Sequence, residues 1–507
     1  MRSSFLFHQI FILKKVQLLF ALFFFGTIHM VQAARYEFTP LATRAYKSVI
    51  SLRFGDAYKD LAQMRLTEPD NLLYYYISDY IDVMKVFVDE DKNEFKKLEK
   101  NKAKRLEALA TGPQDSPYFL LTQAEVNVHW ALARIKQEEY ITAAREISSA
   151  YRMLEKNTKK FPNFAPNNKC LSIMHAVIGT VPDEYKWGLK LLNIDGSMEQ
   201  GRRELDALVD YTKKNNSVFD DEANCIYTFT LLYLGNQGDA AWQTVLDSRL
   251  KPEKNPLAAL GMANVGIKTG HINEAIEYLI KAPRSKNFLE LPYLDYYMGM
   301  AKLYRLDADA NFYLKKYLDT YKGKMGIKET YQKMAWYELI NGNEAGYWSN
   351  LQLAKTKGNA IFEGDKAAQR EAVAGIKPDA MLLKARLLFD GSQFDVALKT
   401  ILTKNVSDYS YNKNYQIEYT YRLGRICHKL NKLAEAVNAY QQTINDGRND
   451  KSHYACNAAL QIGLIYEQQK NYNMARQFFN ICLEINPEDY SASLHQKAKA
   501  GINRCSS

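Results

Sequence analysis

From residue 36 to the C-terminus, apolar residues recur three and four positions apart. This spacing places apolar side chains on one face of an α-helix, whereas a half-buried strand alternates at every second position. No alternating stretch rich in Val and Ile reaches the length of a strand. Most of the 13 prolines lie where an apolar helical stretch begins or ends, as expected of a residue that interrupts helices. The pattern therefore predicts an all-α fold of many short helices.

The last 125 residues repeat with a period of 39. Small residues recur at Ala385, Gly424 and Gly463, and an alanine follows each after twelve positions, at Ala397, Ala436 and Ala475. Larger residues keep the same period at Leu388, Cys427 and Tyr466, and at Ile401, Tyr440 and Phe479. Two helices of a hairpin are expected to approach closely where Gly424 or Gly463 meets Ala436 or Ala475, and aromatic rings fill the space beside the crossing. Each hairpin then buries its apolar face only by stacking on a neighbour, which predicts an α-solenoid.

These residues resemble the tetratricopeptide repeat (TPR) family, whose pattern is a small residue, a large one three further on, Ala, an aromatic four later, and Pro. The fullest match is Gly463, Tyr466, Ala475, Phe479 and Pro487. The family period is 34, so the five extra residues are expected between hairpins, in the polar stretches 405–414 and 445–452. The resemblance implies a superhelix that binds a protein or peptide on its concave face, without catalysis of its own.

Weaker copies of the twelve-residue step lie upstream, at Ala45 and Ala57, Ala131 and Ala143, and Ala263 and Ala275. The chain is therefore divided into residues 34–155, hairpins with two TPR-like units; 156–215, an irregular helical joint; 216–370, degenerate TPR-like hairpins; and 371–507, three repeats. Within the joint, about thirty residues including Val181-Pro182, Gly188-Leu189 and Gly196 weakly resemble the eukaryotic inclusion-body-clearance repeat family. Those relatives act inside cells, so no function is carried over.

Residues 1–33 predict a secretory signal peptide. Arg2, Lys14 and Lys15 precede an apolar run over residues 16–28, and small residues at Val31 and Ala33 fit a cleavage site after Ala33. The run is shorter than the roughly 20 residues that span a bilayer, so a retained anchor is the less favoured alternative. We therefore expect an exported chain, periplasmic or associated with the cell envelope, with no membrane span in the mature protein.

Composition and motifs argue against several classes of protein: those that bind nucleic acids, metals or nucleotide cofactors. Removal of residues 1–33 takes away three of the 67 Lys and Arg and none of the 57 acids, which leaves a charge of 64 − 57 = +7. This mild excess serves solubility and does not indicate nucleic-acid binding. No metal-binding, phosphate-binding or dinucleotide motif occurs, so no metal and no cofactor are expected. Of the six cysteines, Cys427 and Cys482 occupy core positions, and the spacing of the other four identifies no disulfide partners.

The candidate site is the groove lined by the first helices of the repeats. Arg386 and Arg425 share one register 39 apart, and His428 and Lys429 lie one turn further along the same helix as Arg425. Such a basic patch can bind a carboxylate or an acidic peptide. Alternatively, the arginines only pair with nearby acids such as Glu418 and Asp390. A different class also fits serial hairpins: a carbohydrate-active α/α toroid or glycan-binding protein, which as an enzyme requires two converging carboxylates.

Overall fold

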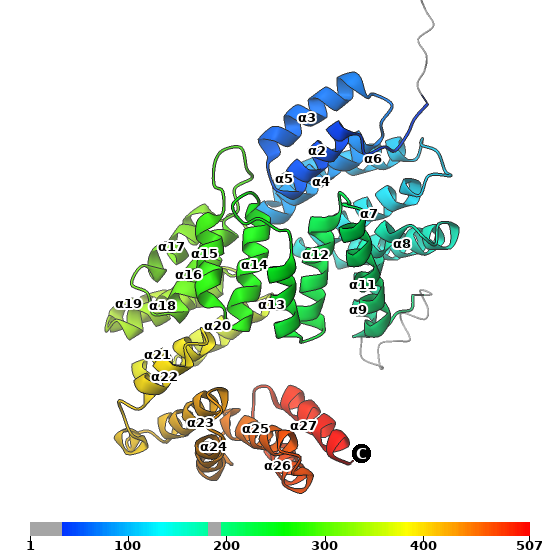
Figure 1. Cartoon of the computed structure of the whole chain (residues 1–507). Coiled ribbons are helices and arrows are strands. Elements are labelled where there is room, and N and C mark those ends of the chain that lie inside the picture. Colours follow the sequence, from blue (N-terminus) through cyan, green and yellow to red (C-terminus); the bar gives the residue numbers. More distant parts are fainter. Residues whose placement is uncertain (1–32, 181–193, 507) are drawn as a thin grey trace, which may run out of the picture.

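The structure, a computed structural model, describes residues 33–180 and 194–506. Throughout these residues the chain is helical, and the one β contact among them is an isolated bridge between Arg35 and Asn71. The expected all-α fold is confirmed. Consecutive helices pack as hairpins, and each hairpin packs on the next to form a curved array (Figure 1).

The N-terminal part of the array contains two hairpins separated by three further helices. Its helices are α2 (Pro40–Ile50), α3 (Phe54–Thr67), α4 (Leu73–Asp89), α5 (Lys92–Leu98), α6 (Lys100–Leu109), α7 (Tyr118–Lys136) and α8 (Tyr140–Lys160). Here α2 packs on α3 and α7 packs on α8, and α4 contacts both hairpins.

The middle part continues the series of hairpins as far as a single helix, α20. Its helices are α9 (Asn168–Gly179), α11 (Met198–Lys214), α12 (Asp220–Phe229), α13 (Gly238–Asp247), α14 (Pro256–Thr269), α15 (Ile272–Lys281), α16 (Tyr293–Tyr304), α17 (Ala310–Thr320), α18 (Ile327–Ile340), α19 (Glu344–Thr356) and α20 (Glu363–Ala374). A π-helical turn, Thr230–Leu234, extends α12.

The predicted joint over residues 156–215 is helical where the structure describes it. Helix α8 continues to Lys160, and α9 packs along α11 as in the other hairpins. The reason is local: Gly201 of α11 is so close to Ser172 and Ala176 of α9 that a Cβ would not fit there. Val181, Pro182, Gly188 and Leu189, which carried part of the weak family resemblance, lie outside the described residues.

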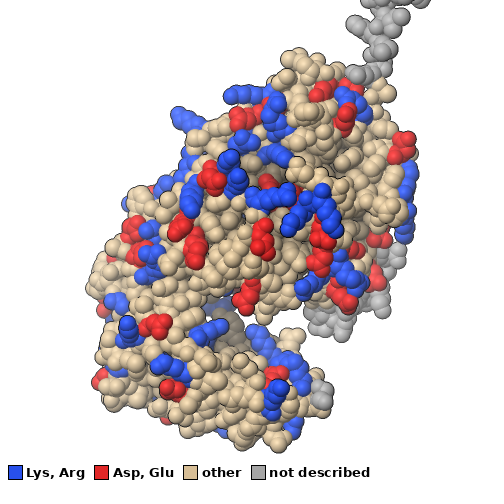
Figure 2. All heavy atoms as spheres, viewed as in Figure 1, with Lys and Arg blue, Asp and Glu red and all other residues tan. Residues whose placement is uncertain are grey.

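The C-terminal part comprises three hairpins and a final helix. These are α21 (Ala380–Asp390) with α22 (Phe394–Ile401), α23 (Lys413–Lys429) with α24 (Leu433–Gly447), α25 (Tyr454–Gln468) with α26 (Tyr472–Glu484), and α27 (Ser491–Ser506). In Figure 1, α23 and α25 face the rest of the molecule, whereas α24 and α26 lie on the outer side. Figure 2 shows a hollow between this part and the remainder of the chain, with Lys and Arg side chains at its edge.

The turns between paired helices share one backbone conformation. In seven hairpins a residue with positive φ lies five positions before the small residue of the second helix. These turn residues are Leu52, Glu138, Asn236, Gly270, Ser392, Asn431 and Lys470. Only one of them is glycine, although a left-handed backbone conformation raises the conformational energy of any other residue by about 1 kcal/mol or more. The geometry of the hairpin therefore imposes this conformation against local preference.

The crossings between paired helices are tight. The alanines of the twelve-residue steps, among them Ala45, Ala57, Ala385 and Ala397, are fully buried. At Gly424 and Gly463, however, the closest neighbour differs from the expected one, because a Cβ would meet the ring of Tyr440 or Phe479 at about 2.6 Å and 2.5 Å, respectively. The aromatic ring of the second helix lies directly on the glycine, closer than Ala436 or Ala475. Phe479 also contacts Gly501 of α27, so its ring is held between two glycines.

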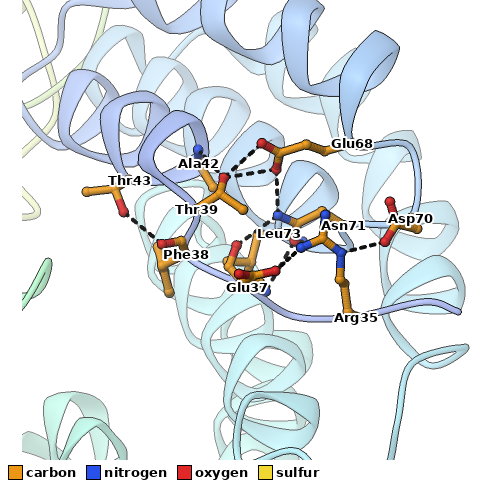
Figure 3. A network of polar contacts seen from close by, with 10 residues as sticks. All are labelled: Arg35, Glu37, Phe38, Thr39, Ala42, Thr43, Glu68, Asp70, Asn71 and Leu73. Atoms are coloured by element: carbon orange, nitrogen blue, oxygen red, sulfur yellow. Dashed lines mark hydrogen bonds and ion pairs between the residues drawn. The ribbon is translucent and has the colours of Figure 1, made fainter. Parts of the chain in front are cut away.

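The N-terminus of the array is fixed by polar contacts (Figure 3). Arg35 forms an ion pair with Asp70, and Asn71 donates a hydrogen bond to the backbone carbonyl of Glu37 at 2.8 Å. Thr39 caps α2 through the backbone N–H of Ala42. The segment before α2 is thereby joined to the loop between α3 and α4.

We predict that Gly463→Ala lowers the free energy of unfolding by about 1–3 kcal/mol, because the new methyl group overlaps a ring that Gly501 prevents from moving. Urea unfolding measures this change. Gly261→Ala in α14 is the control, since nothing lies within 4 Å of its Cβ position, and it should be neutral or slightly stabilising. Equal effects of the two substitutions would contradict the crossing geometry.

We also predict that Lys470→Gly raises the free energy of unfolding by up to about 1 kcal/mol, because glycine adopts the positive φ of this turn without steric cost. Gln469→Gly, one residue earlier at φ −77°, should give no such gain. Thermal unfolding of the two variants distinguishes these outcomes, and a loss of stability in Lys470→Gly would argue against the shared turn.

Candidate functional site

A cavity of about 210 Å³ opens between the first helices of the last three hairpins. Its walls come from α21, α23 and α25, and Tyr490 closes it from the connection between α26 and α27. The lining residues are Ala385, Arg386, Phe389, Asp390, Tyr421, Arg422, Arg425, Ile426, His453, Tyr454 and Tyr490. No residue of α22, α24 or α26 takes part, so the cavity lies on the inner side of the array.

Arg386 and Arg425 both lie in this cavity, each held by an aromatic ring of the preceding hairpin. The guanidinium carbon of Arg386 is 4.6 Å from the ring centroid of Trp336 in α18, and that of Arg425 is 4.4 Å from the ring centroid of Phe389 in α21. Stacking of this kind fixes the plane of the guanidinium group and leaves its edges free to bind a planar anion. The repeat thus places two oriented cations about one hairpin apart.

The balance of charge in the cavity is positive. Arg386 forms an ion pair with Asp390 at 3.7 Å, and Arg422 binds Glu418 at 2.6 Å. Arg425 instead donates a hydrogen bond to the hydroxyl of Tyr421 at 3.1 Å, and no carboxylate of the described residues lies within ion-pair distance of it. The acids therefore neutralise two of the three guanidinium groups. Pairing with Glu418 and Asp390, the alternative considered for the predicted pair, accounts for Arg386 but not for Arg425.

His453 adds no charge to the cavity at neutral pH. Burial lowers its pKa to about 4, and the neighbouring positive charges of Arg422 and Arg386 act in the same direction. Its ring packs against Tyr421, Tyr454 and Tyr490. A neutral imidazole retains one hydrogen-bond donor and one acceptor, so His453 can position a ligand without repelling a cation or attracting an anion.

His428 and Lys429 do not line this cavity. His428 packs against the ring of Tyr440 at 6.2 Å, and burial lowers its pKa. Lys429 is exposed on the last turn of α23. The structure therefore brings together the two predicted arginines and places the other two predicted residues elsewhere on the same helix.

Sequence reasoning missed Arg422, His453 and the tyrosines of the cavity. Arg422 precedes Arg425 by three positions, so helical spacing alone could have placed both on one face. His453 is the N-cap residue of α25, and Tyr490 lies in a connection, outside the 39-residue register. No signal in a single sequence places residues of such connections.

A second cavity, of about 370 Å³, is mainly apolar and lies among α12, α13 and α14. Phe229 and Tyr233 stand at its edge, and the π-helical turn shapes its wall. Gly261 faces open space there. The cavity was not expected from the sequence, because this part of the chain shows no repeated register.

Neither cavity shows a pair of carboxylates suited to glycoside hydrolysis. The first is lined by one acid, Asp390, which pairs with Arg386, and the second is lined by none. Among the residues that the structure describes, no cluster of His, Cys, Asp or Glu is placed to hold a metal ion. The arginine cavity has the charge and the hydrogen-bond donors to bind an anion.

Comparison with known proteins now identifies the C-terminal hairpins. A family profile described as "Tetratricopeptide repeat" matches residues 417–445 and 457–489, which correspond to α23 with α24 and to α25 with α26. The last two hairpins are tetratricopeptide repeats. TPR hairpins typically serve as scaffolds for protein interaction, which is the coarse function that they indicate for this chain. No curated protein matches the chain in sequence.

Three solved structures align over most of the chain. The TPR domain of P58(IPK) is 15% identical and aligns over 82% of this chain and 98% of its own, with a TM-score of 0.21. The APC/C hetero-tetramer Cut9-Hcn1 is 13% identical over 90% of this chain and 96% of that chain, with a TM-score of 0.22. A circular tandem repeat protein with novel repeat topology is 10% identical over 92% of this chain and 94% of that chain, with a TM-score of 0.18. TM-scores this low say nothing about the global shape of this chain.

In the part of the chain that the structure describes, no helix has both the length and the apolarity that crossing a bilayer demands. Two of the three helices that wall the arginine cavity, α23 and α25, lie in the part of the chain that the family profile matches.

The lowered pKa of His453 predicts a specific pH dependence of stability. The folded chain keeps this imidazole neutral down to about pH 4, whereas the unfolded chain binds a proton near pH 6.5, so His453 destabilises the fold as the pH falls through that interval. We expect His453→Gln to lose less stability than the parent chain between pH 7 and pH 5. Urea unfolding at both pH values tests this, and equal losses would contradict the burial of His453.

Proposed function

We propose that this protein is a non-enzymatic scaffold of the cell envelope that binds an acidic segment of a partner protein in the cavity between α21, α23 and α25. The observation that carries the proposal is Arg425, a charged group oriented by Phe389 and lacking a carboxylate partner among the described residues. Arg386, one repeat away, supplies a second oriented guanidinium group. Bidentate binding of carboxylates is the interaction for which this group is best shaped.

The tyrosines of the cavity determine which acidic segments fit. Tyr421, Tyr454 and Tyr490 surround the arginines and offer ring faces to the backbone or to apolar side chains of a peptide. We therefore propose that a carboxylate bound by the arginines is followed by an apolar or aromatic side chain. An extended segment is favoured, because a cavity of about 210 Å³ accommodates side chains but not a folded element.

Export to the envelope is part of the proposal, and it rests on the predicted signal peptide at residues 1–33. Arg35 and Asn71, whose contacts join the segment before α2 to the loop between α3 and α4, both follow the predicted cleavage site, so the mature chain would keep these contacts.

The test is binding to a pool of synthetic acidic peptides, measured by fluorescence anisotropy. We predict that Arg386→Glu with Arg425→Glu weakens binding by about a hundredfold or more, since two charge-assisted contacts are lost. Lys399→Glu with Lys429→Glu is the matched control, because it changes the net charge equally at exposed positions outside the cavity.

The control pair should bind within about threefold of the parent chain, because exposed charges outside the site act only through screened fields. Equal weakening by both pairs would show a general charge effect and reject the cavity. Circular dichroism and thermal unfolding of each variant establish that the fold persists.

A further inference from the structure

Two cysteines face each other inside the last TPR hairpin. Cys456 lies in α25 and Cys482 in α26, and their Sγ atoms are 3.5 Å apart. All six cysteines lie in the described part of the chain, and no other two of them form a sulfur contact there. Both side chains of the pair are fully buried.

The pair is close enough to bond without rearrangement of the hairpin. A disulfide has an S–S length of about 2.05 Å, so the two sulfur atoms need to approach by roughly 1.5 Å. Rotation of the two side chains supplies movement of this size, because the helices that carry them already pack against each other. Cys427 and Cys505, which are also buried, have no sulfur neighbour with which to react.

We propose that Cys456 and Cys482 are an oxidative modification site and form a disulfide that cross-links α25 to α26. The oxidant is a disulfide, either of a thiol–disulfide oxidase or of a small thiol such as glutathione. One cysteine thiolate attacks it and releases one thiol, and the second thiolate then displaces the other thiol. Two electrons pass to the external disulfide, and the two protons of the cysteine thiols end on the two thiols that are released.

Burial dictates when this reaction takes place. Cys482 also lies against the backbone of α27, with its Sγ 4.0 Å from the carbonyl oxygen of Leu494. An external disulfide cannot reach either sulfur once α27 is in place. The bond therefore forms during folding, before the last helix docks, and it needs the oxidising compartment that the proposed export supplies.

The cross-link would act on the wall of the arginine cavity. His453 and Tyr454 stand at the start of α25, two or three residues before Cys456. A bond between α25 and α26 reduces the opening motions of this hairpin and keeps both side chains in position. The pairing itself is a property of the hairpin and does not depend on the identity of the partner.

The test uses the chain from Ala34 to Ser507, unfolded and reduced and then refolded with a mixture of reduced and oxidised glutathione. We expect four free thiols instead of six in a denaturing thiol assay. Tryptic digestion without reduction should give one cross-linked species, joining the peptide of residues 452–470 to that of residues 477–497, lighter by two hydrogens.

Three variants and one dynamic measurement complete the test. Cys427→Ser should keep the bridge and show three free thiols, whereas Cys456→Ser and Cys482→Ser should each show five. Amide exchange in α26 should be slower in the oxidised parent chain than in the reduced one, by more than about tenfold.

Six free thiols in the refolded parent chain, or a mixture of pairings in which Cys427 or Cys505 appears as often as Cys456, would overturn the proposal. The thiol assay needs no ligand, so a failure of peptide binding would not count against the proposed disulfide. If Cys456→Ser does not fold, the cross-linked peptide of the parent chain remains decisive.

Discussion

The packing of the last two hairpins depends on the contact between an aromatic ring and a residue without a side chain. Where Phe479 lies between Gly463 and Gly501, three helices approach one another around one ring. Tyr440 lies on Gly424 in the same way one repeat earlier. At Phe479 the contact sets both the crossing within the hairpin and the position of α27, whereas Tyr440 sets the crossing within its own hairpin. The first helices of these two hairpins, α23 and α25, form two of the three walls of the cavity.

The stacking of one hairpin on the next also positions the arginine side chains of the cavity. Two of the three arginines of the cavity rest on a ring from the hairpin before them, Arg386 on Trp336 and Arg425 on Phe389. The binding surface thus exists only when consecutive hairpins are in contact, because a single hairpin would supply either the cation or the ring. This arrangement couples the function we propose to the integrity of the array, as expected of a quasi-one-dimensional repeat protein.

The sequence predicted the helices and site residues that belong to a repeated register, and it could not predict those outside one. The 39-residue period located α21 to α26, and the twelve-residue step located α2 with α3, α7 with α8 and α14 with α15. The repeat pattern could not place α5, α6 or α20, which belong to no repeated unit. It also could not identify α9 and α11 as a hairpin, because their close contact is at Gly201 and does not follow the usual register.

In the candidate site, the repeated register predicted Arg386 and Arg425. His453 and Tyr490 lie at a helix end and in a connection, whose positions depend on tertiary packing. The apolar cavity beside Gly261 likewise depends on a π-helical turn that no local pattern predicts.

The most direct test of the proposed binding site is hydrogen–deuterium exchange of the chain with and without the tightest-binding acidic peptide of the pool. Binding in the arginine cavity predicts protection confined to α21, α23 and α25 and to the connection that carries Tyr490. Protection of α12 to α14, around the apolar cavity, or of the outer helices α22, α24 and α26, would contradict it.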